Sequence, residues 1–395
     1  MITGLLFQTY KGFYDFEIGL YIYELLVLNL VYFIIWAFLA FLVQTLISNP
    51  YVGLFVMIVL LIGIPILSLA GVEQSIFKYN QGAGRSYSDM NGYGATLNLY
   101  FIYKIYWFSL GLVFSILTAL FYVRGLPSNF NEKIIIAKSR FKGKYPFFIT
   151  FFTLIFLSIG GYIYYENNIL NKRTTQKESE IITVEGEKKY KKYENYKQPR
   201  IVSVNVDVNI FPSTRDVNAS GEYVMINKTK EAIDSIFLDH NSLISTFKFD
   251  KETDLVSEDT IYNLDIYKLG TPLYPGDSLK LSFSLKNKPN TVLRNNSQII
   301  YNGTFINSSI FPSLGYSLGE LRDDKTREKY DLPPNKLKPH PSDSTSLGNT
   351  YIAKDADWID FEATVSTSKD QIAIAPGYLQ KEWIEGDRRY FHYKM

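Results

Sequence analysis

The stretch Tyr145–Tyr165 divides the chain into two parts that suit different solvents. It is almost wholly apolar, and so are three earlier runs of similar or greater length. The chain beyond about residue 200 instead alternates apolar and polar residues. A helix that spans a bilayer needs about 20 mostly apolar residues, because each adds ~1.5 Å across a ~30 Å hydrocarbon core. The sequence therefore predicts membrane helices followed by a domain exposed to water.

The predicted membrane segment covers residues 1–165, with about four spanning helices, at approximately 18–47, 52–72, 97–123 and 146–165. Buried helices of a soluble protein are the alternative, but these rarely stay apolar on all sides over such lengths. None of the runs has the length and cleavage site of a signal peptide. Four polar residues interrupt them. We expect Glu24 and Lys104 to reach water at span ends, and the amide side chains of Asn29 and Gln44 to bond neighbouring helices.

Charge in the short loops predicts the orientation. The loop between the third and fourth spans carries six Lys or Arg residues against one acid, Glu132, and should therefore be cytoplasmic. The balanced loop between the second and third spans should lie outside, together with the large C-terminal part.

A charged linker is expected over residues 166–200. It places Tyr190, Tyr193 and Tyr196 at three-residue intervals among lysines. On a helix these rings form a stripe, which could bind anionic lipid headgroups or pack on the following domain. We favour packing.

The segment Ile201–Phe211 alternates apolar and polar residues, as a half-buried strand does. Similar patterns with turn signals between them predict an all-β domain over 201–395, an antiparallel sandwich or open sheet, with a long loop at 322–349. The further strands are expected at 222–227, 233–239, 243–249, 261–269, 278–285, 358–366, 371–375 and 388–393.

Complete catalytic motifs are absent from the sequence. There is no cysteine, and the three histidines are too far apart for a local metal pair. His-Glu-x-x-His, Gly-x-Ser-x-Gly and the phosphate-binding Gly-x-x-x-x-Gly-Lys-Ser/Thr are all missing. We therefore assign this chain no catalytic residue, no metal ligand and no cofactor, and we expect no nucleic-acid partner.

Several segments resemble a known family. The strand pattern after the linker resembles the N-terminal β-domain of M1 aminopeptidases, and a Phe-Pro segment and two later segments are similar in place to elements of those enzymes. Together with a Gly-rich loop, the order of parts resembles bacterial fusion proteins that join an ABC-2-type permease to an M1 aminopeptidase. The strand pattern comprises Val204–Pro212, Gly221–Asn227 and Ile233–Leu238. The Phe-Pro segment is Phe311–Tyr316, and the two later segments are Phe361–Ser366 and Gln371–Gly377. The Gly-rich loop contains Tyr87–Gly94.

This resemblance implies a saddle-like β-domain that stands outside a bacterial inner membrane on a multi-pass anchor. It implies more permease helices before residue 1 and a zinc domain after residue 395, so this chain would be an inactive part of a zinc metalloaminopeptidase. The implied partners are the lipid bilayer, a separate ABC ATPase subunit and a peptide substrate. Candidate substrate-binding residues are Asn302, Thr304 and Tyr316. M1 enzymes usually place Gln or Glu near the substrate's amino group, and no acid stands at residues 302–305.

Two other functions remain open. The chain could be a membrane-anchored β-sandwich that binds or assembles with other molecules and has no enzymatic role, or a permease subunit of an ABC transporter. The sequence does not give a transported solute, a peptide specificity or an oligomeric state.

Overall fold

A computed structural model describes residues 1–123, 130–171, 173–240, 244–287, 297–335, 339–344, 346 and 357–395. The described chain divides into a helical unit up to Arg173 and a β-rich unit from Thr174 onward. Each unit has its own buried core.

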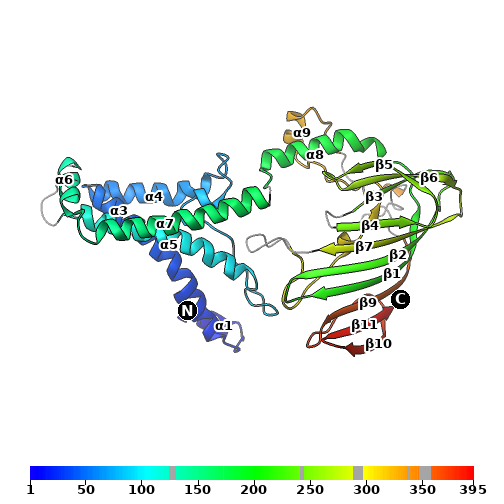
Figure 1. The fold of residues 1–395 in the computed structure, drawn as a ribbon, viewed down its shortest axis with the longest axis horizontal. Coiled ribbons are helices and arrows are strands. Elements are labelled where there is room, and N and C mark those ends of the chain that lie inside the picture. Colours follow the sequence, from blue (N-terminus) through cyan, green and yellow to red (C-terminus); the bar gives the residue numbers. More distant parts are fainter. Residues whose placement is uncertain are drawn as a thin grey trace. The chain divides into compact units, whose positions relative to one another are not determined.

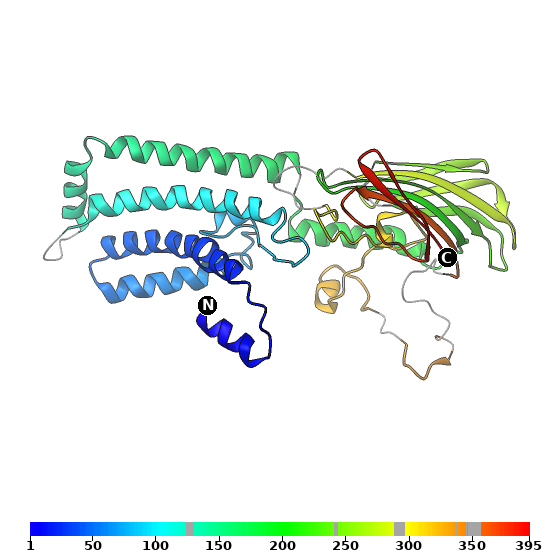
Figure 2. The same ribbon diagram turned by 90° about the horizontal axis from the view of Figure 1, so that it is seen from below.

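The helical unit is a layer of long helices. In both views α7 packs beside α5, α5 beside α3 and α3 beside α4, and α6 lies across one end (Figures 1 and 2). Its elements are α1 (Ile2–Tyr10), α2 (Ile18–Ile22), the π-helical η1 (Tyr23–Asn29), α3 (Leu30–Leu46), α4 (Pro50–Ile66), η2 (Ser75–Phe77), α5 (Thr96–Phe121), α6 (Phe130–Arg140), α7 (Tyr145–Tyr165) and η3 (Glu166–Leu170).

Among the described residues, three helices are long and apolar enough to cross a membrane: Ile18–Leu46, Thr96–Phe121 and Tyr145–Leu170. The expected helix at 52–72 is shorter than predicted, because α4 has 17 residues and ends at Ile66. Pro65 lies in its last turn. Proline has no N–H to donate to the helix, and the chain continues from residue 67 in successive turns.

Two basic side chains of the loop between α5 and α7 close the ends of longer helices. The Lys133 ammonium donates hydrogen bonds to the carbonyls of Thr45 (2.9 Å) and Leu46 (3.4 Å) at the end of α3. Arg140 donates to the carbonyl of Leu120 (3.2 Å) in the last turn of α5. The last carbonyls of a helix have no partner within it and carry partial negative charge, so both contacts are favourable.

The polar residues of the apolar helices behave differently from expectation. Lys104 does not reach water: it is buried, and its ammonium donates to the carbonyl (2.9 Å) and side-chain oxygen (2.7 Å) of Asn80. Asn29 does not bond a neighbouring helix. Its amide donates to the Glu24 carbonyl, and its oxygen accepts from Arg85 (3.0 Å) in the loop before α5. These side chains therefore hold the loop over residues 74–95 in place.

The β-rich unit contains two sheets, two α-helices and eleven strands within the described residues. The elements are α8 (Gln176–Tyr190), η4 (Lys191–Tyr193), β1 (Arg200–Phe211), β2 (Asp216–Ile226), β3 (Ile233–Asp239), β4 (Ile244–Phe249), β5 (Thr253–Asp259), β6 (Leu264–Leu273), β7 (Ser278–Asn287), η5 (Ser308–Ile310), β8 (Ser313–Leu314), α9 (Asp324–Lys329), β9 (Asp360–Ser368), β10 (Tyr378–Glu385) and β11 (Arg388–Lys394).

The large sheet has seven strands in the order β10-β11-β9-β1-β2-β7-β4, and the small sheet has four in the order β5-β6-β3-β8 (Figure 1). The pairs are antiparallel, as predicted, with one exception. β1 and β9 run parallel, with Ser203 opposite Asp360 and Asn209 opposite Ser366. This pairing joins two strands far apart in sequence at the middle of the sheet.

The core lies between the two sheets. Val206 and Val208 of β1 face it from the large sheet, and Ile236 and Leu238 of β3 face it from the small one. The alternation predicted in β1 is confirmed at its centre, because the exposed Asn205 and Asp207 alternate with the buried Val206 and Val208. In β3 the intervening residue is also buried, since the second face of the small sheet is covered as well.

That second face is covered by α8 and η4. Phe237 of β3 clusters with Tyr190, and the ring of Tyr193 lies 4.9 Å from the ring of Phe237. The Tyr190 hydroxyl and the Lys189 ammonium both donate to the carboxylate of Asp259. The packing alternative for the tyrosine stripe is therefore the one observed, and the linker predicted at 166–200 contains a helix of the β-rich unit.

Edge strands account for most differences from the predicted strands. β5 and β10 are not predicted; each has a neighbour on one side only, and both are mostly exposed, so neither needs a regular apolar pattern. The strand expected at 371–375 is not formed. That segment follows β9, whose ladder positions are already occupied by β1 and β11.

The long loop predicted at 322–349 contains α9 and one deeply buried cation. Arg327 is completely buried and donates two hydrogen bonds to the carboxylate of Glu187 in α8, at 2.9 and 2.7 Å. It also donates to the carbonyl of Leu321 (3.0 Å). Within the same loop, residues 336–338, 345 and 347–349 lie outside the described residues.

Removing this cation should destabilise the β-rich unit strongly. In Arg327→Met, Glu187 stays buried with Lys191 as its remaining cationic partner, and we expect the free energy of unfolding to fall by about 3 kcal/mol. The double variant Glu187→Gln/Arg327→Met should recover most of this loss, because it removes both buried charges. Urea denaturation followed by circular dichroism measures the change. Arg322→Met, at an exposed position, is the matched control, and an equal loss there would contradict the prediction.

Asp259 should make stability depend on acid pH. Burial opposes its ionisation, but hydrogen bonds from Lys189 and Tyr190 outweigh burial and lower the pKa of Asp259 to about 2. Its pKa in the unfolded chain is near ~3.9, so its contribution is complete above about pH 4 and is lost as the pH falls through 2. Asp259→Asn should therefore be about 2 kcal/mol less stable than the native chain at pH 6. Denaturation at pH 6 and at pH 2 should show that most of this difference is lost at pH 2.

Candidate functional site

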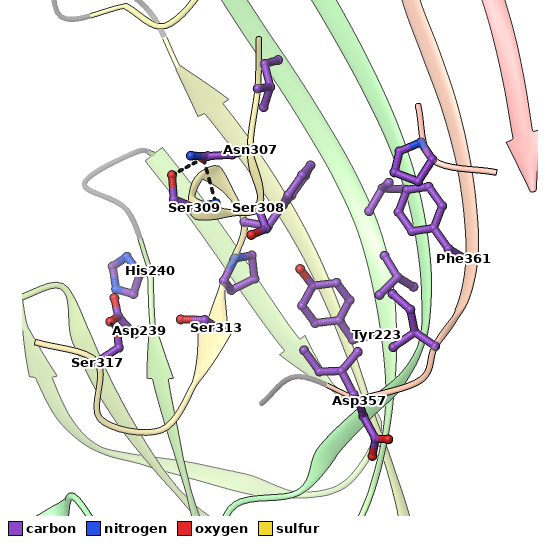
Figure 3. Close-up of a pocket in the computed structure, with 18 of the residues that line it drawn as sticks. Tyr223, Asp239, His240, Asn307, Ser308, Ser309, Ser313, Ser317, Asp357 and Phe361 are labelled. Carbon is purple, nitrogen blue, oxygen red and sulfur yellow. Dashed lines mark hydrogen bonds between the residues drawn. The ribbon is translucent and has the colours of Figure 1, made fainter. Parts of the chain in front are cut away.

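A cavity of about 830 Å³ opens in the β-rich unit and is lined by residues of both sheets. One wall is the inner face of the large sheet, with Val204 and Val206 from β1, Tyr223 from β2 and Phe361 from β9 (Figure 3). Val206 and Tyr223 also pack in the core, whereas Val204 and Phe361 are only half-buried and border the open space. The volume is in the range that proteins use for small ligands.

The opposite side of the cavity is polar. Antiparallel pairing of β3 with β8 sets Asp239 opposite Ser313, and both line the cavity. Ser317 lies just beyond β8 and donates a hydrogen bond from its hydroxyl to the Asp239 carboxylate. Figure 3 shows these side chains and His240 facing Tyr223 and Phe361 across the cavity. The site therefore has an apolar wall and a hydrogen-bonding wall.

His240 has a buried acid behind it. Its Nε2 lies 3.5 Å from Oδ2 of Asp265 in β6, and its ring lies 5.3 Å from the ring of Phe247. Burial raises the pKa of the Asp265 carboxyl, and the interaction with His240 acts against this rise. The carboxylate and the ring of Phe247 together fix the orientation of the imidazole at the cavity wall.

The residues proposed from sequence are not among those that line this cavity. Asn302 is exposed. Thr304 uses its hydroxyl locally, since it accepts from the Ile300 N–H and donates to the Ile300 carbonyl, both at 3.0 Å. Tyr316 is buried with Tyr190 in the cluster under α8. Contact of these three residues with a substrate stays a prediction.

Sequence reasoning missed the residues that line this cavity. The segment between the proposed residues, from Ile306 to Ser313, forms one side of the cavity. Its Asn307 side chain accepts a hydrogen bond from the Ser309 N–H (3.1 Å), which closes a tight turn at η5. The run Asn307-Ser308-Ser309 was the available signal, because such residues favour turns that expose polar groups. His240 and Asp239 had no local signal.

The described residues do not form a metal site. No three His, Asp or Glu side chains among them are grouped closely enough to hold an ion. A catalytic zinc needs three protein ligands around one point. His392 does pair with Glu362 (2.9 Å) between β11 and β9, but two ligands do not fit that requirement. We therefore assign no zinc-binding role to the described residues.

No family model matches the chain, and no curated protein matches it. Solved structures do match. A mutant of a two-domain M1 zinc metallopeptidase bound to L-arginine is 16% identical, with a TM-score of 0.28, over 50% of this chain and 39% of that chain. A mutant M1 zinc metallopeptidase from Deinococcus radiodurans bound to a Tyr-Ser-Ala substrate has the same identity and coverage and a TM-score of 0.29.

A further M1 zinc metallopeptidase from Deinococcus radiodurans gives a TM-score of 0.28 at 16% identity, over 50% of this chain and 38% of that one. The chain thus spans less than two fifths of the length of these neighbours. These structure neighbours are M1 zinc metallopeptidases, and each match covers half of this chain. The chain also has three long apolar helices and a β-rich domain.

The open space beside β1 can be tested by filling it. Val204→Trp should change the free energy of unfolding by less than about 1 kcal/mol, because the larger ring can extend into the cavity. Val208→Trp, four residues further along the same inner face of β1, should cost about 3 kcal/mol, because it overfills a packed core. Urea denaturation compares the two variants. Equal losses would show that the cavity is closed in solution.

Proposed function

We propose that this chain is the membrane-anchored, non-catalytic part of an M1-type zinc metalloaminopeptidase fused to an ABC-2-type permease. The apolar helices hold it in a bacterial inner membrane. The β-rich unit stands on the extracytoplasmic side and flanks the peptide cleft of a zinc domain that this chain does not contain.

The observation that carries this proposal is an apolar surface at the end of the large sheet. The hairpin β10–β11 and the segment before it expose five large apolar side chains, called the hairpin surface: Ile372, Ile374, Tyr378, Leu379 and Ile384. Tyr378 and Ile374 are 80% and 85% exposed. Exposed apolar side chains on and beside an edge strand favour association with another domain, because burying them removes apolar area from water and pairs the free edge.

The cavity supports a role in binding peptide. Its apolar wall suits a peptide side chain, and the carboxylate, hydroxyl and amide groups opposite suit a peptide backbone or amino terminus. In this proposal Asp239 and Ser313 hold backbone groups while Tyr223 and Phe361 contact the side chain. The catalytic step itself belongs to the zinc domain.

The charges at the helix ends support the proposed orientation. Lys133 and Arg140 bind the final carbonyls of α3 and α5 at the end of the unit where the basic loop lies. Basic loops stay on the cytoplasmic side. The β-rich unit, connected to the other end of α7, is then extracytoplasmic. A separate ABC ATPase subunit would act from the cytoplasmic side.

A second function is favoured by the cavity alone. A membrane-anchored β-sandwich that binds a ligand without hydrolysing it would need the same apolar and polar walls, and would need no zinc domain.

Hydrolysis by the complete gene product distinguishes these functions. We expect the complete product to cleave leucine p-nitroanilide, to lose this activity with a chelator and to regain it with zinc, whereas residues 1–395 alone should be inactive. Ile384→Glu in the complete product should lower kcat/KM by about tenfold or more, because it places a charge in the docking surface.

Val256→Glu is the control, since Val256 is a similarly exposed apolar residue on β5. Chelator-sensitive cleavage by residues 1–395 alone would refute the proposal. A complete product that binds peptide and never cleaves it would favour the binding module.

A further inference from the structure

The helical unit contains a second cavity, of about 610 Å³. It lies between the N-terminal segment and the Gly-rich loop before α5. Four aromatic side chains line it, from both of these segments and from α2: Phe13, Tyr21, Tyr87 and Tyr93. The proposed peptidase function leaves this cavity unused, and it lies wholly within the helical unit.

The Gly-rich loop is folded so that it presents two of these rings. Ser88 and Gly92 exchange backbone hydrogen bonds of 2.9 and 2.7 Å across a tight turn. Gly92 has φ of +58°, which side-chain-bearing residues rarely adopt. Tyr87 and Tyr93 flank this turn and meet edge to face, with ring centroids 5.3 Å apart.

The base of the cavity is a fixed polar network. The Tyr93 hydroxyl donates to the Glu24 carboxylate (2.6 Å), and Arg85 donates to Glu24 (3.2 Å) and to Asn29 (3.0 Å). Arg85 also lies over the ring of Tyr100, 4.9 Å from its centroid. The one cation among the lining residues is therefore already neutralised by Glu24.

Three further lining carboxylates have no such partner. Asp15, Glu17 and Asp89 form no ion pair with any residue in the part of the chain that the structure describes. Burial, and the charges of Glu17 and Asp89, raise the pKa of the Tyr87 phenol, so this ring stays neutral beside them. The cavity therefore has an excess of negative charge next to neutral aromatic faces.

A buried acceptor adds an independent observation. The side-chain oxygen of Gln8 in α1 is buried, and within the described residues it accepts no hydrogen bond. Gln8 also lines the cavity. A buried polar atom without a partner is unfavourable, and a ligand that donates a hydrogen bond would satisfy it.

We infer that this cavity binds a primary ammonium group. Carboxylates, an amide oxygen and the faces of tyrosine rings are all groups that attract a cation with N–H donors. An anion would meet three carboxylates, and a neutral apolar ligand would leave the Gln8 oxygen unsatisfied. The amino terminus of a peptide or amino acid and a polyamine share this chemistry. The inference does not rest on the peptidase proposal.

Titration calorimetry on the whole chain in detergent micelles tests the inference with defined probes. L-leucinamide and putrescine carry primary ammonium groups from the two sources, and N-acetyl-L-leucinamide is the neutral control. We expect saturable binding of at least one ammonium probe and none of the neutral amide. The double variant Glu17→Gln/Asp89→Asn should weaken this binding by about tenfold or more.

Asp254→Asn is the matched control, because it removes an exposed carboxylate from β5 in the other unit. It should leave the affinity unchanged. Binding of leucinamide alone identifies an amino terminus as the ligand, and binding of putrescine alone identifies a polyamine. Melting curves should show that the double variant is as stable as the native chain, since both of its positions are exposed.

Three results would overturn the inference. The first is no saturable binding of either ammonium probe. The second is tetramethylammonium, which has no N–H, binding as tightly as leucinamide. The third is an affinity that the double variant leaves unchanged. Each result is independent of peptide hydrolysis, so it would leave the peptidase proposal untouched.

Discussion

Burial of the small sheet on both faces determines most of the β-rich unit. Ile236 and Leu238 of β3 face the large sheet, while Phe237 between them needs cover on the other side. α8 supplies that cover through Tyr190, and the carboxylate of Glu187 on the same helix holds Arg327. The position of α8 thus fixes α9 and the chain around β8. The polar wall of the larger cavity is a product of the same packing.

Elements that bury a continuous or alternating apolar pattern were predictable. The limits of β3 match the prediction, and β1 differs by one residue, because their side chains must face a core with a regular period. β5 and β10 were missed since most of their side chains are exposed, which leaves no such pattern. The parallel pairing of β1 with β9 was missed because nothing local in either strand encodes its direction.

Both cavities combine residues that lie far apart in sequence. Asp239 and Ser313 meet through the β3–β8 pairing, 74 residues apart by their numbers, and Glu24 meets Arg85 across a whole helical hairpin. The sequence could indicate that Asn302–Tyr316 and the Gly-rich loop were unusual. It could not indicate which distant side chains would face them, because such pairs depend on tertiary packing. Lys104 illustrates the same limit, since Asn80 gives it a buried partner that composition does not reveal.

The parallel pairing has a consequence for how the chain is made. β1 lies in the middle of the large sheet, yet its neighbour β9 is synthesised about 150 residues later, which at about 5–20 residues per second is a delay of roughly 8–30 s. During this interval β1 can pair with β2 but presents a free edge on its other side. High contact order of this kind slows folding and exposes the nascent domain to aggregation. A chaperone that shields unpaired strands would therefore be most needed before β9 emerges.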